Sequence, residues 1–139
     1  MRIMRSIAAI VVGLGFMAAT VTVGTLVASA LIGSGEPTDG RPLGTAATAY
    51  LYGNLVICGI GAILGGWLAA RIASFAPYGH AAAMAAIVAV LSATTATGAP
   101  APVHPGWYPS VLGLVAVLGV LLGGKLRAAA ASPPGPVVA

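Results

Sequence analysis

Few side chains in this sequence could do chemistry, and the two histidines are the first to consider. His and Met are the usual axial ligands of a haem, and His80 and His104 lie at opposite ends of a long apolar segment. If that segment crosses a membrane, about 30 Å separates them, so they cannot hold one cofactor together. We expect His80 to cap a helix at the membrane surface, with a role as a pigment or haem ligand as the alternative.

Asn54 is the one amide side chain in the apolar part of the sequence. Inside hydrocarbon its donors and acceptor need partners, so it should form a hydrogen bond to a neighbouring helix. We expect that partner to be a threonine of the first apolar segment, where Thr20 is a second polar residue at membrane depth. Ligand binding by Asn54 is the alternative. We expect the single cysteine, Cys58, to act as a small buried apolar residue.

The acidic residues Glu36 and Asp39 lie in a polar segment rich in turn formers, residues 33–42. Two exposed carboxylates in such a loop normally bind only water. The sequence contains no nucleophile–base pair, no phosphate-binding loop and no metal-ligand spacing. We therefore predict that the protein is not an enzyme and has no metal, no other cofactor and no nucleic-acid partner.

The composition identifies the elements that must position these residues. Of the 139 residues, 59% are hydrophobic and only 6% are charged, whereas a soluble domain carries about 25% charged residues. The chain therefore belongs in a lipid bilayer. The interiors of its apolar segments carry no formal charge, which disfavours a proton-coupled carrier because such proteins need an ionisable group inside the membrane.

Four apolar segments predict an all-α fold, a polytopic bundle of four transmembrane helices. A helix that crosses the hydrocarbon needs about 20 mostly apolar residues. Residues 33–42 and the proline-rich residues 98–106 cannot continue a helix. We expect a single transmembrane domain over residues 1–131, a flexible tail over 132–139, and spans at about 7–32, 46–71, 80–98 and 108–125.

The cations indicate the orientation, because five of the six lie on one side of the predicted membrane. These five are Arg2, Arg5, Arg71, Lys125 and Arg127. The positive-inside rule places this side in the cytoplasm, with both termini. Only Arg41 lies on the other side, where Trp107 and Tyr108 are expected in the interfacial aromatic belt.

The first segment also resembles a secretory signal, since Arg2 and Arg5 precede an apolar run that ends in an A-x-A pattern at residues 28–30. The run over residues 7–28 is longer than the roughly 7 to 15 residues of a signal core. We therefore expect a retained transmembrane helix.

Glycine patterns predict how the helices pack. Residues 61–68 (GAILGGWL) and 119–126 (GVLLGGKL) share a G-x-x-x-G-G frame. This suggests two repeated helical hairpins related by an axis along the membrane normal, with chance similarity of composition as the alternative. Small residues let helices approach closely in a membrane. The glycines expected at helix contacts are Gly53, Gly61, Gly65, Gly66, Gly119, Gly123 and Gly124.

The second half of the chain carries a recurring pattern: GGWLAARIA at residues 65–73, His80, WYP at 107–109 and GGKLR at 123–127. In these features residues 65–139 resemble a group of small, uncharacterised bacterial inner-membrane proteins with four spans. The resemblance implies a location in the bacterial inner membrane and implies no activity.

These observations predict a small integral membrane protein without catalytic activity. We expect an accessory or structural subunit that packs against itself or against a larger membrane complex. A small channel or transporter for an uncharged solute is the alternative, with a cavity lined by Asn54 and threonines. A pigment- or quinone-associated subunit is a further alternative.

Overall fold

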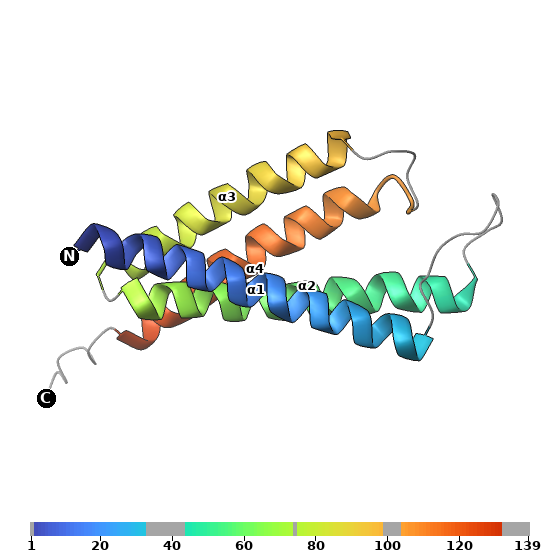
Figure 1. Ribbon diagram of the computed structural model, residues 1–139, viewed down its shortest axis with the longest axis horizontal. Coiled ribbons are helices and arrows are strands. Elements are labelled where there is room, and N and C mark those ends of the chain that lie inside the picture. Colours follow the sequence, from blue (N-terminus) through green and yellow to red (C-terminus); the bar gives the residue numbers. More distant parts are fainter. Residues whose placement is uncertain (1, 33–43, 74, 99–103, 132–139) are drawn as a thin grey trace, which may run out of the picture.

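A computed structural model describes residues 2–32, 44–73, 75–98 and 104–131, and this part of the chain forms four α-helices and no strand (Figure 1). The helices are α1 (Arg2–Ile32), α2 (Thr45–Ala73), α3 (Pro77–Gly98) and α4 (Tyr108–Ala131). All four are long and apolar enough to cross a membrane. The prediction of an all-α bundle of four membrane-spanning helices is confirmed.

All four helices extend beyond the spans expected from hydrophobicity, α2 by no more than two residues at either end. α1 already begins at Arg2, α3 begins at Pro77, and α4 continues past Lys125 to Ala131. Apolar composition marks where the hydrocarbon ends, whereas alanine and the basic residues favour helix also in water, and proline fits the first helical turn. The predicted loop over residues 33–42 and the predicted tail 132–139 lie outside the described residues.

Each helix of the bundle packs mainly against its neighbours in the spatial order α1, α2, α4, α3. The most extensive contacts join α1 to α2, α2 to α4 and α3 to α4, and among the helix pairs in contact α1 and α3 touch least. α1 begins and α4 ends at the same end of the bundle (Figure 1). We call this end, with Gly13, Ala81 and Gly124, the inner half, and the opposite end, with Thr25 and Tyr108, the outer half.

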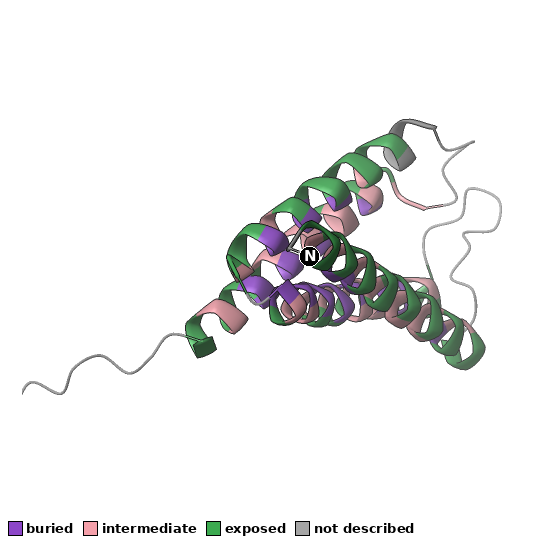
Figure 2. Ribbon diagram, turned by 60° about the vertical axis from the view of Figure 1, so that its left-hand side comes forward, coloured by how far each residue is buried: buried purple, intermediate pink, exposed green. Residues whose placement is uncertain are grey.

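The inner half is the closed part of the bundle. α1 and α3 lie together there and diverge toward the outer half (Figure 1), and buried residues gather where the helices converge (Figure 2). Met84 lies at this convergence and is fully buried. Around it lie alanines with no exposed surface: Ala62, Ala69 and Ala81. The core is therefore built from small side chains, which bring the helix backbones close together.

α1 differs from the other helices in how little of it is covered. It is the most apolar of the four spans and has the smallest buried share. Large side chains along its whole length are exposed, from Ile3 through Val11 to Leu31. Most of this helix is therefore available to lipid or to another protein.

Candidate functional site

A polar cluster joins three helices in the outer half of the bundle. Thr25 Oγ1 in α1 donates a hydrogen bond of 2.7 Å to Asn54 Oδ1 in α2. Asn54 Nδ2 in turn donates a bond of 2.6 Å to the Tyr108 hydroxyl in α4. Asn54 is 8% exposed and Tyr108 is 3% exposed. Both ends of the amide thus have partners, and the Tyr108 hydroxyl can still donate its own hydrogen.

The threonine that bonds to Asn54 is Thr25 and not Thr20. Thr20 Oγ1 donates to the carbonyl of Phe16 in its own helix, at 2.9 Å. The cluster continues along α1 to one more hydroxyl group. Ser29 Oγ donates a hydrogen bond of 2.8 Å to the Thr25 carbonyl. From the sequence, any of several threonines in α1 could be the partner of Asn54. Which one forms the bond depends on how α1 is rotated and shifted against α2.

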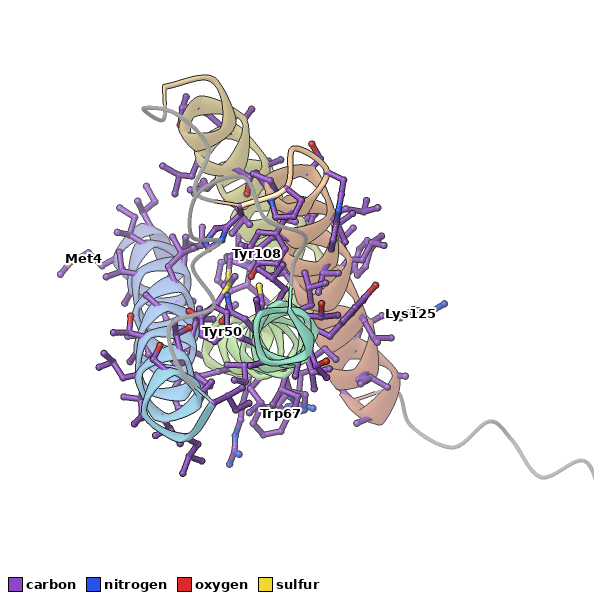
Figure 3. The ribbon with its side chains drawn as sticks, turned by 90° about the vertical axis from the view of Figure 1, so that its right-hand side faces the viewer. Met4, Tyr50, Trp67, Tyr108 and Lys125 are labelled. Carbon is purple, nitrogen blue, oxygen red and sulfur yellow. The ribbon has the colours of Figure 1, made fainter. Side chains whose placement is uncertain are left out.

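Tyr108 and Trp107 are neighbours in the sequence but have different surroundings. Tyr108 packs in a buried group with Ala28, Tyr50 and Leu51, and Tyr50 and Tyr108 lie between the helices in Figure 3. Trp107 is 44% exposed and lies beside Tyr52. Only Trp107 thus has the exposed position expected of an interfacial aromatic residue. The expectation for Tyr108 differs from the structure because its hydroxyl has a buried partner in Asn54.

His104 covers the outer side of this cluster. Its ring lies edge-on to the ring of Tyr108, with 5.2 Å between the ring centroids. Its Nδ1 atom is buried and has no hydrogen-bond partner among the described residues. The contact between His104 and Tyr108 is therefore one between their rings.

A cavity of about 380 Å³ lies next to the polar cluster, toward the middle of the bundle. Cys58 lines it from α2, one helical turn from Asn54, and is itself 4% exposed. All four helices contribute to the lining, which is mainly apolar: Leu14, Met17, Ala18, Val21, Thr22, Cys58, Val88, Leu91, Ser92, Pro109, Leu112, Gly113 and Ala116.

The two pairs of adjacent glycines lie where helices cross most closely. A Cβ atom added to Gly65 would lie 2.8 Å from the Gly13 carbonyl oxygen of α1, and one added to Gly66 would overlap the Val120 carbonyl of α4. A Cβ atom on Gly123 would overlap the Ile63 carbonyl of α2. On Gly124 it would overlap the Ala81 side chain of α3. Adjacent residues point about 100° apart on a helix, so each glycine pair faces two neighbouring helices at once.

The other glycines expected at helix contacts fall into two groups. A Cβ atom on Gly61 would lie 3.2 Å from Val21, and one on Gly119 would lie 2.7 Å from Ala62. One on Gly53 would meet nothing within 4 Å. Equivalent glycines of the expected repeat face different partners, since Gly65 meets α1 but Gly123 meets α2. The two glycine-rich segments therefore share a sequence frame but not their contacts.

The basic residues gather at the inner end of the bundle. Arg2 opens α1, and Arg5 Nε donates to the Ile72 carbonyl at 3.2 Å. The Arg71 guanidinium lies over the Trp67 ring, 5.1 Å from its centroid, and Lys125 extends away from the helices (Figure 3). Arg127 is half-buried, two residues further along α4.

His80 has local partners at the same end. Its Nδ1 atom lies 3.0 Å from the Ala76 carbonyl, and its ring is edge-on to Phe75 at 5.1 Å between centroids. These contacts are typical of a residue in the first turn of a helix. Among the described residues, no three His, Cys, Asp or Glu side chains come together in a way that could hold a metal ion.

Sequence reasoning found Asn54 and a bond to a threonine of the first span, but it did not identify this threonine as Thr25, the second partner as Tyr108, or the mainly apolar cavity. The only sequence feature that pointed to Tyr108 as a partner was its position at the start of a span. A tyrosine at this position can either be exposed at the membrane surface or face inward. Comparisons of the chain with protein-family models, with curated proteins and with solved structures found no match.

Proposed function

We propose that this protein is a non-catalytic subunit of the bacterial inner membrane that associates with a second copy or with a larger membrane complex. The observation that carries this proposal is α1, the most apolar of the four helices and the least covered by its own chain. Small residues on its exposed side would let another helix approach closely. A Cβ atom added to Gly15 meets nothing within 4 Å, and Ala19 is exposed one turn further on.

The orientation is part of the same proposal. Arg5, Arg71 and Lys125 lie at the end of the bundle where α1 begins and α4 ends. Under the positive-inside rule this end faces the cytoplasm, with both termini.

Association is tested by the mass of the purified full chain in mild detergent and in native membrane extracts. We expect a dimer or a complex with other membrane proteins. Ala19→Trp should separate the partners, whereas Leu118→Trp, on an exposed site of α4, should leave the mass unchanged. A native chain that is monomeric and without partners under all these conditions would contradict the proposal.

Orientation is tested with cysteines introduced into a Cys58→Ala background. An impermeant maleimide added to intact cells should label Gly106→Cys and should label Ala131→Cys only after the membrane is opened. Both positions are exposed in the structure. The opposite labelling pattern would reverse the proposed orientation.

A solute channel is the alternative function. The cavity is the feature that favours it, because all four helices line it. Its lining is mainly apolar, and Asn54 is already engaged by two hydrogen bonds, so we place this function second. Flux of a small uncharged solute into liposomes that contain the purified chain would support it. Absorbance of the native particle tests the remaining alternative, a pigment- or quinone-associated subunit.

A further inference from the structure

The cavity beside Cys58 lies at membrane depth and is open to one side. On α1 its lining runs from Leu14 to Thr22, a rise of about 12 Å, and Cys58 is close to the middle of α2. α1 and α3 diverge at this level and have the fewest contacts of the neighbouring helices. Ala18 and Thr22, both exposed, line the opening. The cavity therefore communicates with the hydrocarbon of the bilayer between α1 and α3.

Buried side chains border the cavity along the axis of the bundle. Toward the inner half, Met84 fills the space between α1, α2 and α3 and is fully buried. Toward the outer half, Asn54 and Tyr108 form the polar cluster with Thr25.

The volume of the cavity limits what can enter. A helix about 10 Å across occupies about 850 Å³ over only two turns, whereas the cavity measures about 380 Å³. A transmembrane helix of a second copy or of another protein is therefore too large. A single hydrocarbon chain is narrow enough, and the cavity is within the size range of small-molecule sites.

We propose that this cavity binds one unbranched acyl chain of a bilayer phospholipid, which enters between α1 and α3. The lining offers the chain apolar side chains from all four helices, including Val21, Val88 and Leu112. Acyl chains are the most concentrated apolar molecules at this depth, so mass action favours them over any minor lipid of similar affinity. An isoprenoid quinone would need a strong contact to its head group to displace them.

A photoreactive lipid tests the proposal in the membrane. The full chain is placed in vesicles of phosphatidylethanolamine and phosphatidylglycerol that contain a phospholipid with a diazirine in mid-chain. After irradiation, adducts are mapped by peptide mass spectrometry. Cys58, Val88 and Ala116 line the cavity and are at most 6% exposed. We expect adducts at these buried positions in addition to outward-facing ones such as Val56.

A matched pair of variants connects the adducts to the cavity. Ala18→Trp places a large side chain in the opening, and we expect loss of the adducts at Cys58, Val88 and Ala116. Leu118→Trp is the control, because Leu118 is exposed on α4 and does not line the cavity. It should keep these adducts. Adducts at Val56 in both variants show that α2 is still in the bilayer, and an unchanged unfolding transition by circular dichroism shows that the bundle is folded. Thr22→Trp repeats the test if Ala18→Trp does not fold.

Three outcomes would overturn the proposal. The native chain could carry adducts only at outward-facing positions, or Leu118→Trp could remove the buried adducts as completely as Ala18→Trp. In the third, a minor amount of an isoprenoid quinone abolishes the buried adducts, which would assign the cavity to the quinone. None of these results depends on whether the protein associates with partners.

Discussion

The inner and outer halves of this bundle hold their helices together by different means. In the inner half, Gly66 and Gly123 bring the backbones of α2 and α4 into direct contact. In the outer half, Asn54 connects α1 and α4 by hydrogen bonds through longer side chains. Small residues close one end, whereas the polar cluster holds α1, α2 and α4 and does not include α3. This difference explains how α3 can diverge and leave a cavity at the level of Cys58.

The comparison also shows why packing in a membrane differs from packing in water. Lipid chains are as apolar as leucine, so burying a large side chain gains little there. The inner half instead gains close contact between backbones at glycine and alanine. The outer half gains hydrogen bonds that lipid cannot supply. We expect the largest losses of stability where the backbones touch.

Gly66→Leu tests the inner half and should have the largest effect. The first side-chain atom already overlaps the Val120 backbone, so α2 and α4 must separate, at a cost of more than about 3 kcal/mol. The measurement is the free energy of unfolding in mixed micelles, followed by circular dichroism. Gly53→Leu is the control, since a Cβ atom there meets nothing within 4 Å. Equal losses in both variants would show that the close crossing is not what stabilises this half.

Asn54→Leu tests the outer half. It leaves the Thr25 and Tyr108 hydroxyls without their partner, and we expect a loss of about 1 to 2 kcal/mol. A double-mutant cycle with Tyr108→Phe isolates the Asn54–Tyr108 bond. We expect the double variant to be less destabilised than the sum of the two single ones. Strict additivity would mean that the 2.6 Å bond contributes nothing to stability.

Ala76→Gly tests the short connection between α2 and α3 in the inner half. Ala76 has a φ of 43°, the only positive φ of a non-glycine residue in the described chain. A residue with a side chain is destabilised by about 1 to 2 kcal/mol in this conformation, so glycine removes this strain. Part of the resulting gain in stability is lost because glycine has more conformational freedom in the unfolded state. We expect stabilisation by up to about 1 kcal/mol, measured as above. Destabilisation would indicate that the Ala76 methyl group has a packing role.

Thr25→Val and Thr20→Val form the most sensitive pair. Thr25 bonds across to Asn54, and its loss should cost about 0.6 kcal/mol, the average for such bonds in a membrane. Thr20 bonds only to the Phe16 carbonyl of its own helix, so its replacement should have almost no effect. The difference between the two unfolding free energies is the quantity to measure. A larger loss for Thr20→Val would mean that α1 is rotated from its position in the structure.

Much of the fold could be predicted because membrane insertion depends on local composition. Runs of apolar residues predict the four spans and therefore an even number of membrane crossings. The basic residues next to these runs predict that Arg5, Arg71 and Lys125 gather at one end. Asn54 could be singled out because an amide in hydrocarbon must find a partner. Which partner it finds could not be predicted, because Thr20 and Thr25 differ only in how α1 is rotated against α2.

The sequence by itself determined that this chain forms four apolar helices with small residues at regular intervals, because length, hydrophobicity and glycine spacing are local properties. The tertiary structure decided which helix each small residue meets. Gly65 and Gly66 face two different neighbours, whereas a Cβ atom on Gly53 would meet no atom of the described residues within 4 Å. It also decided that Tyr108 turns inward to Asn54 and that α1 and α3 part around a cavity. These features depend on the rotation and tilt of whole helices, which are set by all contacts in the bundle together.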